Sequence, residues 1–328
     1  MAENKVSVII PIYKVERFIE RCVVSLMQQT LNEVEYIFVD DASPDDSVNI
    51  LREVVERYPS RRECVKIVTH SENKGLPAAR NTGLAETTGE YIFHCDSDDF
   101  VELDMLEVLY NKAKECDADV GWCDFFLSFE TNERYMKQPS YTTPNEALKA
   151  MLSGAMKYNV WNKLVKRSLY IDNNISFPAG YGMGEDMTMM MLCANARKVA
   201  YVPRAFYHYV KLNTGAFSQT YSDRHLVELK HNVQRIVDYM QVKFGSGIEQ
   251  ELAFFKLDVK FPFLITDDSR KYRVWQEWYP EANKYIGKNK LISARSNALQ
   301  WLAWKGQLWV VKLYYILINK FIYGVIYK

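Results

Sequence analysis

Residues 6–12, which read VSVIIPI, form an apolar and largely β-branched run that closes on Pro11 and Tyr13. A run of this kind is typical of a strand buried on both faces of a parallel sheet. A helical pattern follows over Glu16–Gln29, and a second strand pattern follows over Glu35–Val39. The start of the chain therefore predicts the strand–helix–strand unit from which parallel sheets are built.

The alternation of strands and helices continues for another hundred residues. Ser43, Pro44 and Asp46 predict an N-cap, a first-turn proline and an acid at the start of a helix that runs to about Arg57. The next elements are strand Val65–Thr69, helix Pro77–Thr87, strand Tyr91–Cys95, helix Asp104–Glu115 and strand Asp119–Cys123. We therefore predict an α/β fold with a Rossmann-like, mostly parallel sheet flanked by helices.

After about residue 215 the pattern becomes helical. Helices are expected over His225–Phe244, over Ile248 to about Leu264, and in the tail from about Leu299. We predict a first domain over residues 1–215 and a helical C-terminal region over residues 216–328.

Composition excludes several classes of protein. The chain has 328 residues, of which 48% are hydrophobic and 25% charged, so it can bury a core and is not disordered. Its six cysteines show no C-x-x-C spacing, which argues against a zinc ribbon or a disulfide framework. The N-terminus shows no secretion leader, so we expect a cytoplasmic protein with reduced thiols.

Charge is unevenly distributed along the chain. There are 41 basic and 41 acidic residues, so no overall field attracts nucleic acid. After Glu281, however, no acidic residue follows, and eight basic ones do. Residues 1–281 therefore carry 33 basic and 41 acidic side chains, a net charge of −8, and the tail carries +8.

Acidic residues follow two of the predicted strands. Asp40 and Asp41 come directly after the second strand, and Asp96, Ser97, Asp98 and Asp99 come after the fourth. The carboxyl ends of parallel strands share one edge of the sheet, where ligands bind. Convergent carboxylates favour a divalent cation that bridges them to phosphate oxygens. The alternative is that they are solvated turn and cap residues.

Five motifs in order resemble family 2 glycosyltransferases, which are inverting enzymes of the GT-A fold that use nucleotide sugars. They are V8-I-I-P-I-Y13, V39-D-D-A-S43, N73-K-G75 with A79-R-N-T-G83, D96-S-D-D99 and G184-E-D186. The resemblance covers roughly residues 5–210. It implies a GT-A catalytic domain over residues 1–215 with a helical C-terminal extension, and a nucleotide-sugar donor that is most often a UDP-sugar. Within this domain, residues 1–100 would bind the nucleotide sugar and residues 101–215 would form the acceptor side.

The resemblance also implies roles for individual residues around the donor. Pro11 and Tyr13 would line the nucleotide pocket, Asp40 would accept a hydrogen bond from the base, and Asp96 would face the ribose. Asp98 would ligate Mn²⁺ or Mg²⁺ against the diphosphate. Arg80 and Lys163 would face the nucleotide or its phosphates, although an arginine on a helix is as often a solvated surface residue.

Glu185 and Asp186 follow three alternating glycines and precede a helical stretch that begins at Met187. Carboxylates at a helix N-terminus are favoured by the helix dipole, so capping alone could explain both. The resemblance instead implies a catalytic pair in which Asp186 is the general base. A positioned base of this kind typically contributes about 10²- to 10⁴-fold to a rate. One inversion would convert an α-linked D-sugar donor into a β-linkage.

The resemblance predicts addition of a single sugar, because the Q-x-x-R-W signature of processive relatives is absent. The expected acceptor is a saccharide, plausible as a lipid-linked one, in bacterial capsule, O-antigen or exopolysaccharide synthesis. Two rivals remain. One is a metal-dependent nucleotidyltransferase, and the other is a non-catalytic nucleotide-sugar binding or scaffold protein.

The tail over residues 299–328 combines aromatic residues with four lysines. No stretch reaches the ~18 uncharged apolar residues of a spanning helix, so we predict an amphipathic helix on the inner face of an anionic membrane. On a helical wheel, Lys305, Lys312, Asn319 and Lys320 share one sector, and Val311, Leu313, Leu317, Ile318 and Phe321 lie opposite. The alternative is a helix that packs on the catalytic domain or on another copy of the chain.

Overall fold

The computed structural model describes residues 4–212 and 222–318. It divides into two compact units. The first contains residues up to Ala147 together with Tyr158–Ile236, and the second contains Leu148–Lys157 and the chain from Val237 onward. The predicted domain boundary at residue 215 lies outside the described residues, and the unit boundary falls within helix α8 (Asp223–Phe244).

The first unit is built on a nine-stranded sheet with the strand order β3-β2-β1-β4-β8-β6-β9-β5, in which β7 pairs with β6. The strands are β1 Val6–Ile12, β2 Val34–Asp40, β3 Val65–Thr69, β4 Tyr91–His94, β5 Phe100–Val101, β6 Val120–Ser128, β7 Glu133–Met136, β8 Lys163–Lys166 and β9 Val199–Val210. Strands β3, β2, β1 and β4 are parallel, as predicted. In the other half, β8 runs antiparallel to both of its neighbours, whereas β6 and β9 are parallel.

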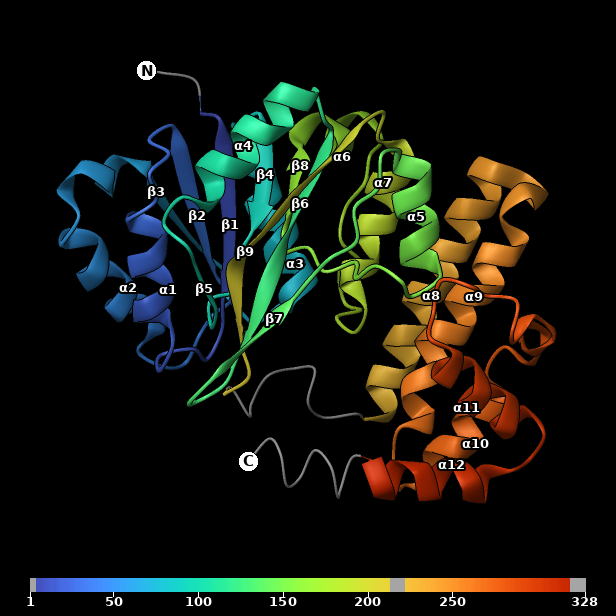
Figure 1. Ribbon diagram of the computed structural model, residues 1–328. Helices are drawn as coiled ribbons and strands as arrows, with labels where there is room; N and C mark the ends of the chain where they lie inside the picture. The colour runs from blue at the N-terminus through green and yellow to red at the C-terminus, as the bar shows by residue number, and fades with distance from the viewer. Residues whose placement is uncertain (1–3, 213–221, 319–328) are drawn as a thin grey trace. The chain divides into compact units, whose positions relative to one another are not determined.

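Helices cover both faces of this sheet, as the sequence pattern predicted (Figure 1). Those confined to the first unit are α1 Ile19–Met27, α2 Ser47–Glu56, α3 Leu76–Ala85, α4 Met105–Cys116, α6 Arg167–Asp172 and α7 Thr188–Asn195. Helix α2 begins later than expected and has Asp46 as its N-cap. The reason is that the hydroxyl of Ser43 accepts from the backbone N–H of Lys14 at 2.8 Å and donates to Asp45.

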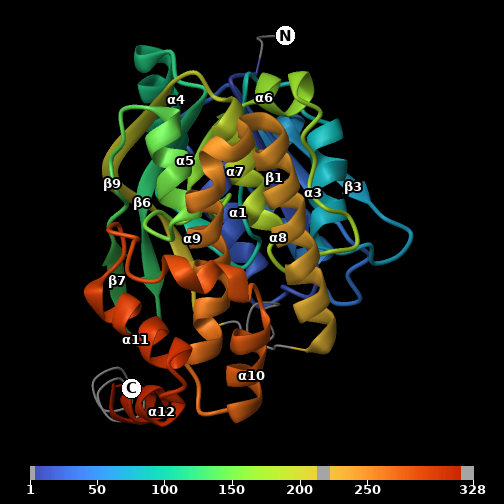
Figure 2. The same cartoon turned by 90° about the vertical axis from the view of Figure 1, so that its right-hand side faces the viewer.

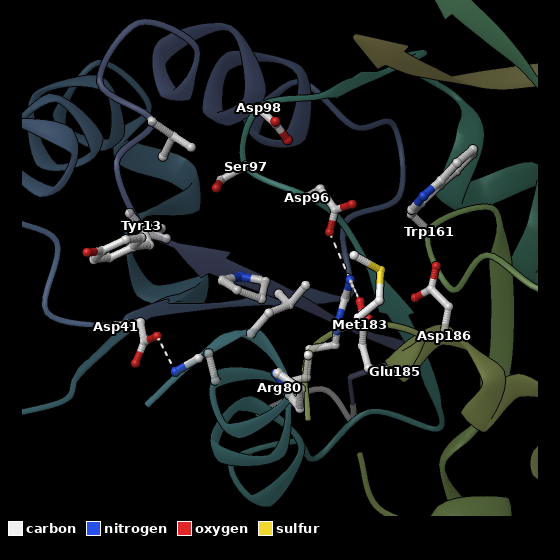
Figure 3. Close-up of a pocket in the computed structure, with 18 of the residues that line it drawn as sticks. Tyr13, Asp41, Arg80, Asp96, Ser97, Asp98, Trp161, Met183, Glu185 and Asp186 are labelled. Atoms are coloured by element: carbon white, nitrogen blue, oxygen red, sulfur yellow. Dashed lines mark hydrogen bonds and ion pairs between the residues drawn. The ribbon is translucent and has the colours of Figure 1, made fainter. Parts of the chain in front are cut away.

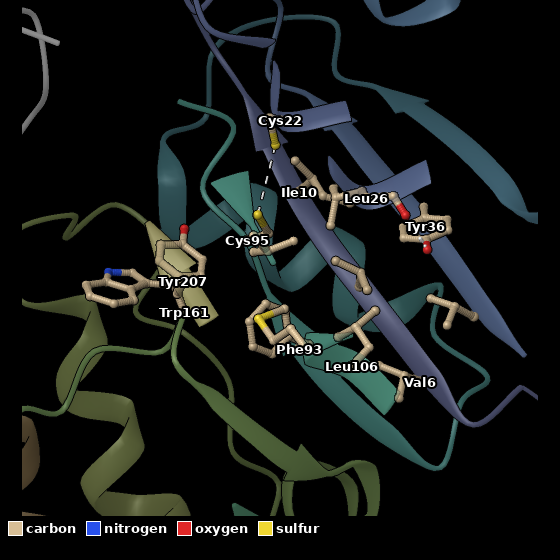
Figure 4. Packing of buried hydrophobic residues seen from close by; sticks show 14 of the residues in the cluster. Val6, Ile10, Cys22, Leu26, Tyr36, Phe93, Cys95, Leu106, Trp161 and Tyr207 are labelled. Atoms are coloured by element: carbon tan, nitrogen blue, oxygen red, sulfur yellow. Dashed lines mark hydrogen bonds between the residues drawn. The ribbon is translucent and has the colours of Figure 1, made fainter. Parts of the chain in front are cut away.

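The hydrophobic core packs helices against both faces of β1. All seven residues of β1 are buried, as expected of a strand covered on both faces. Val6 and Ile10 pack with Leu26 of α1 and Leu106 of α4 on one face (Figure 4). On the opposite face, Gly83 of α3 lies so close to Ile9 that a Cβ at this position would collide with it. Helix α3 is therefore held tightly against the end of β1.

The second unit is helical. Besides the end of α5 (Pro144–Leu152) and of α8, it contains α9 Glu249–Lys260, α10 Ser269–Glu277, α11 Ala294–Trp304 and α12 Leu308–Tyr315. Figures 1 and 2 both show α10, α11 and α12 gathered together. The helix expected up to Leu264 ends at Lys260, because Pro262 introduces a 3₁₀ turn. In residues 4–212 and 222–318, no helix combines the length and apolarity needed to cross a bilayer.

Candidate functional site

A cavity of about 760 Å³ opens at the carboxyl edge of the parallel strands, and all of its walls belong to the first unit. Tyr13 and Asp41 lie at one end, Glu185 and Asp186 lie at the other, and Asp96 lies between them (Figure 3). The acidic clusters that follow β2 and β4 therefore meet in one cavity. This convergence was the main geometric prediction from the sequence.

Seven of the nine predicted site residues line the cavity. These are Pro11, Tyr13, Arg80, Asp96, Asp98, Glu185 and Asp186. Two others, Asp40 and Lys163, belong to the described part of the chain but do not line it. The structure therefore brings together most of the predicted set and moves two members out of direct contact with a ligand in the cavity.

Asp40, which the resemblance predicted at the base, does not line the cavity, whereas its neighbour Asp41 does. Asp40 is the last residue of β2, it is buried, and its carboxylate accepts from the backbone N–H of Ser43 at 2.8 Å. Asp41 is the residue that lines the cavity. Successive side chains of a strand point to opposite sides, so a choice between two adjacent aspartates requires the register of the strand end.

The carboxylate of Asp41 is held by three hydrogen-bonding partners. It lies 2.7 Å from Nδ1 of His70, and it accepts from the backbone N–H groups of Lys74 and Gly75 at 2.8 Å each. Nε2 of His70 lies 2.8 Å from the hydroxyl of Thr82, which fixes the ring from its other side. Gly75 has a φ of +86°, which few other residues tolerate. This end of the cavity is therefore rigid before any ligand arrives.

Lys163 lies behind the cavity wall and not in it. It is fully buried, and its ammonium donates to the backbone oxygen of Asn159 at 2.7 Å and to Oδ1 of Asn162 at 2.9 Å. Burial lowers the pKa of Lys163 to about 7, and the charge of Asp186 opposes that shift. Lys163, which the resemblance predicted to face the nucleotide or its phosphates, therefore does not line the cavity. Trp161, two residues earlier, lines the cavity instead.

The loop that follows β4 presents two of its three aspartates to the cavity. Asp99 is fully buried, where it accepts from the hydroxyl of Tyr207 and from the backbone N–H of Val210 at 2.7 Å each. The same hydroxyl of Tyr207 accepts from the backbone N–H of Asp96 at 3.0 Å. Asp99 therefore anchors the loop, and Asp96 and Asp98 remain at the cavity surface.

Arg80 is a buried cation with incomplete hydrogen bonding. Its Nη2 lies 3.0 Å from a carboxylate oxygen of Asp96 and 3.9 Å from one of Glu185. Burial opposes its charge, but Asp96, Asp186 and Glu185 together raise the pKa of the guanidinium. Nε and Nη1 have no hydrogen-bond partner among the described residues. Buried donors of this kind are rare and mark places where a ligand or water completes the network. Arg80 is therefore not the solvated surface residue that the sequence also allowed.

Glu185 and Asp186 form the most strongly perturbed carboxyl pair in the cavity. They follow Gly184, whose φ of +91° turns the chain into the 3₁₀ turn before α7. Burial and the neighbouring Asp186 raise the pKa of Glu185 to about 8, although Arg80 opposes the shift. Burial also raises the pKa of Asp186, to about 6, against the effects of Arg80 and a backbone hydrogen bond from Val160. Burial therefore favours a proton on this carboxyl pair, and it raises the pKa of Glu185 more than that of Asp186.

One oxygen of Asp186 has no partner. Oδ1 is buried and accepts no hydrogen bond from the described residues. A buried carboxylate oxygen without a donor costs free energy, on the order of 1–3 kcal/mol. Because Asp186 lines the cavity, a hydroxyl group bound there could donate to this oxygen.

The cavity wall also contains residues that the sequence did not single out. Cationic side chains line it at Lys14, Lys74, Lys211 and Arg224. Burial lowers the pKa of Lys211, and the nearby carboxylates of Asp99 and Asp98 oppose that shift. Lys74 belongs to the motif N73-K-G75, but no local motif distinguishes Lys14, Lys211 and Arg224 from the other lysines and arginines of the chain. Only the folding of β9 and α8 against the sheet edge brings Lys211 and Arg224 to the site.

The donor set is compatible with a hard cation that also binds substrate oxygens. Within residues 4–212 and 222–318, no group of three or more His, Cys, Asp or Glu side chains could hold a metal ion by itself. Mg²⁺ usually binds through one or two carboxylates together with substrate phosphates. Asp98 at the cavity surface meets that requirement without a third protein carboxylate.

Comparison with known proteins gives consistent matches. Residues 7–183 match the family model Glycosyl transferase family 2. The cholesterol galactosyltransferase of Borreliella burgdorferi is 33% identical over 276 residues, which cover 80% of this chain and 74% of the relative. The poly(ribitol-phosphate) beta-glucosyltransferase of Bacillus spizizenii is 31% identical over 64% of this chain but only 33% of the relative.

A solved structure shares the fold over the whole chain. It is that of Staphylococcus aureus TarS residues 1–349 in complex with UDP-GlcNAc, with a TM-score of 0.68. The match covers 99% of this chain and 93% of the other, at 20% sequence identity. The predicted architecture, with its helical C-terminal extension, is therefore confirmed.

Proposed function

Because this chain belongs to glycosyl transferase family 2, we propose that it transfers one sugar from a nucleoside diphosphate sugar to a hydroxyl of a saccharide acceptor, with inversion. The observation that carries this proposal is the position of Asp186. Its carboxylate lines the same cavity as Asp98 and Asp41, and one of its oxygens lacks a donor. An acceptor hydroxyl is the group that would supply the missing hydrogen bond.

We place each part of the donor next to the cavity residues whose chemistry suits it. The nucleoside would occupy the end with Pro11, Tyr13 and Asp41. There the ring of Tyr13 can pack against the base, and polar groups lie nearby. The diphosphate would lie near Asp96 and Asp98, within reach of the cavity cations. A UDP-sugar is the donor we favour, and the binding of UDP-GlcNAc by the similarly folded TarS supports this choice.

Transfer in this geometry needs one proton acceptor. The acceptor oxygen attacks the anomeric carbon, the bond from that carbon to the diphosphate oxygen breaks, and the hydroxyl proton passes to Asp186. The pKa of about 6 suits this role, because the carboxylate is ionised at neutral pH yet remains a usable base. Attack from the face opposite the diphosphate inverts the anomeric centre.

The residues around Asp186 have supporting roles in this proposal. Arg80 stabilises the ionised form of Asp186 and also pairs with Asp96. Protonated Glu185 avoids a second negative charge beside the base. Asp98, with Asp96 beside it, would hold Mn²⁺ or Mg²⁺, which when bound supplies neutralisation of the charge on the leaving diphosphate.

The proposed acceptor belongs to bacterial surface polysaccharide synthesis, and we favour a lipid-linked saccharide at the cytoplasmic face of the membrane. The names of the two relatives support a lipid or a cell-wall polymer as acceptor, because one transfers galactose to cholesterol and the other glucose to poly(ribitol-phosphate). Tyr158 lines the cavity and is the aromatic residue that we favour for contact with a sugar ring, because the rings of Trp161 and Tyr209 already stack on each other.

Slow donor hydrolysis tests the proposal without knowledge of the acceptor. The full chain is incubated with UDP-, GDP- and dTDP-sugars, with and without Mn²⁺, and free nucleotide, sugar and pyrophosphate are measured. We expect release of nucleoside diphosphate from one donor class. Release of pyrophosphate would indicate a nucleotidyltransferase, and tight donor binding without any turnover would indicate a scaffold or binding protein.

A further inference from the structure

The outer face of α12 is apolar. Trp309, Leu313, Ile316 and Leu317 are 68%, 47%, 39% and 54% exposed, whereas Val311 is fully buried. At about 100° per residue, the four exposed side chains occupy one side of the helix and Val311 lies opposite. Lys312 borders them at one edge and is also exposed. We call these five exposed residues the α12 face.

This arrangement differs from the amphipathic helix that the sequence predicted. The expected apolar side contained Val311, Leu313 and Leu317 together, but Val311 points inward and the other two point outward. The predicted continuous helix is also interrupted, because Gly306, with a φ of +74°, separates α11 from α12. Asn319, Lys320 and Phe321 of the predicted wheel lie outside the described residues.

The neighbouring helix α11 also exposes large apolar side chains. Trp301 and Trp304 of α11 are 49% and 44% exposed. The ammonium of Lys305 lies 4.8 Å from the centre of the Trp304 ring. Tryptophans and lysines at the rim of an apolar patch are typical of side chains that occupy the boundary between lipid headgroups and acyl chains. Single exposed apolar residues need no explanation, but a contiguous group of them does.

A cationic groove lies beside the α12 face. It has a volume of about 330 Å³ and lies between α10 and α12, with Arg273, Lys312, Tyr272 and Trp309 in its wall. Neither Arg273 nor Lys312 forms an ion pair with the described residues. Two cations next to exposed apolar side chains match an anionic headgroup attached to an acyl chain.

The charge of the surrounding chain favours a lipid over a second copy as the occupant. No acidic residue follows Glu281, and eight basic residues do. A two-fold interface would bring the α12 face of one copy against the same face of the other, and it would place Lys312 and Arg273 near their own counterparts. An anionic bilayer offers the complementary charge, at about 1 kcal/mol per cation near the surface.

We propose that the α12 face and its groove form a docking surface for an anionic lipid bilayer, with the apolar side chains at acyl depth and Arg273 and Lys312 on lipid phosphates. This contact would hold the enzyme at the membrane without a spanning helix. The proposal is independent of the donor chemistry, because it uses none of the cavity residues.

The test is flotation of the full chain with vesicles of phosphatidylcholine containing about one third phosphatidylglycerol, compared with phosphatidylcholine alone. We expect co-flotation only with the anionic vesicles. The double substitution Trp309→Glu with Leu313→Glu should reduce the bound fraction at least about tenfold. Arg273→Gln with Lys312→Gln should reduce binding about 30-fold, because each cation contributes about a fivefold change.

Matched control variants distinguish binding through this surface from nonspecific hydrophobic or electrostatic binding. Val242 of α8 is 90% exposed and apolar, so Val242→Glu adds the same chemistry at another site and should leave flotation unchanged. Lys284→Gln with Lys288→Gln removes two exposed cations from the same basic region and should change binding less than threefold. Thermal unfolding and donor hydrolysis, measured on every variant, establish that each remains folded.

Three outcomes would overturn the proposal. The first is failure of the wild-type chain to float with anionic vesicles while a known lipid-binding protein does. The second is equal loss of binding in the control variants. The third is a lipid-free dimer, seen by light scattering, that Trp309→Glu with Leu313→Glu converts to a monomer, because the face would then belong to a second copy. None of these outcomes affects the donor-hydrolysis test of the proposed function.

Discussion

The two ends of the cavity differ in how completely their buried polar groups are hydrogen-bonded. At one end, the buried Asp41 receives two backbone N–H groups and a histidine, and its partner His70 is itself held by Thr82. At the other end, the buried Arg80 and one buried oxygen of Asp186 have polar atoms without hydrogen-bond partners among the described residues. The first end is a completed network, whereas the second is an incomplete one.

The difference indicates which end performs chemistry. Satisfied buried polar groups make a structure rigid and specific, and unsatisfied ones cost stability unless a ligand completes them. Proteins keep such groups mainly where function requires them. The incomplete network around Asp186 should therefore control the rate, and the completed network around Asp41 should mainly control stability. The following predictions test this contrast.

The largest effect is expected from Asp186→Asn. The amide cannot take up the proton of the attacking hydroxyl. The rate of transfer should therefore fall about 10²- to 10⁴-fold, while donor binding changes little. Transfer is measured with a working acceptor, and donor affinity is measured by calorimetry. The matched control is Asp117→Asn, because Asp117 is 61% exposed and has a φ of 50°, which asparagine tolerates. Normal transfer by Asp186→Asn would remove the assignment of the base.

Arg80→Met tests whether the incomplete network also carries a large electrostatic load. Removal of the guanidinium leaves Asp96, Glu185 and Asp186 without their cation, which should lower the free energy of unfolding by about 3–5 kcal/mol. The loss should be smaller at pH 5, because Asp186, whose pKa is raised to about 6, then binds a proton. Arg57→Met is the control, because Arg57 forms an exposed pair with Glu20 that contributes at most about 1 kcal/mol. Equal losses of unfolding free energy in the two variants would show that the buried guanidinium of Arg80 contributes no more to stability than the exposed one of Arg57.

Asp98→Asn should weaken the binding of the donor and leave the proton transfer to Asp186 unchanged. We expect Mn²⁺-dependent donor affinity to fall about 10- to 100-fold, as for loss of one charge-assisted contact. Donor binding measured without metal should change much less. Calorimetry with and without Mn²⁺, on this variant and on Asp117→Asn, separates the two effects. An unchanged metal dependence would exclude Asp98 as the ligand.

His70→Ala tests the completed end. Asp41 loses one of three donors and Thr82 loses its partner, so the free energy of unfolding should fall by about 1–3 kcal/mol. Transfer, measured below the new unfolding temperature, should fall less than tenfold. A rate loss as large as that of Asp186→Asn would erase the contrast between the two ends.

The smallest effect is expected from Glu185→Gln, and it depends on pH. The folded-state pKa of Glu185 is raised from 4.5 to about 8, so the native protein keeps this proton. The stabilising contribution is fully present below pH 4.5 and is lost as pH rises through about 8. The variant stays neutral, so its free energy of unfolding relative to wild type should rise as the pH increases from 5 to 9. Glu115→Gln, at a 68% exposed position, should show no such trend.

Much of the fold could be predicted because it depends on local patterns. Strand β3 has the predicted bounds, and β1 is buried along its whole length because an apolar run without alternation has no solvent side. The helix start at Ser43 was wrong, because the hydroxyl of Ser43 bonds across to Lys14 and the cap moves to Asp46. A hydrogen bond between segments about 30 residues apart cannot be recognised from either segment alone.

By itself, the sequence determined that a parallel sheet would carry acidic loops to one edge, because strand direction and element order follow from periodicity and turn residues. Only the tertiary structure decided that Asp41 and not Asp40 faces the cavity, that Lys163 lies behind its wall, and that the apolar residues of α12 point outward. These choices rest on side-chain direction. A shift of one residue in a strand or a quarter turn in a helix reverses which side is exposed, and packing against distant elements decides it.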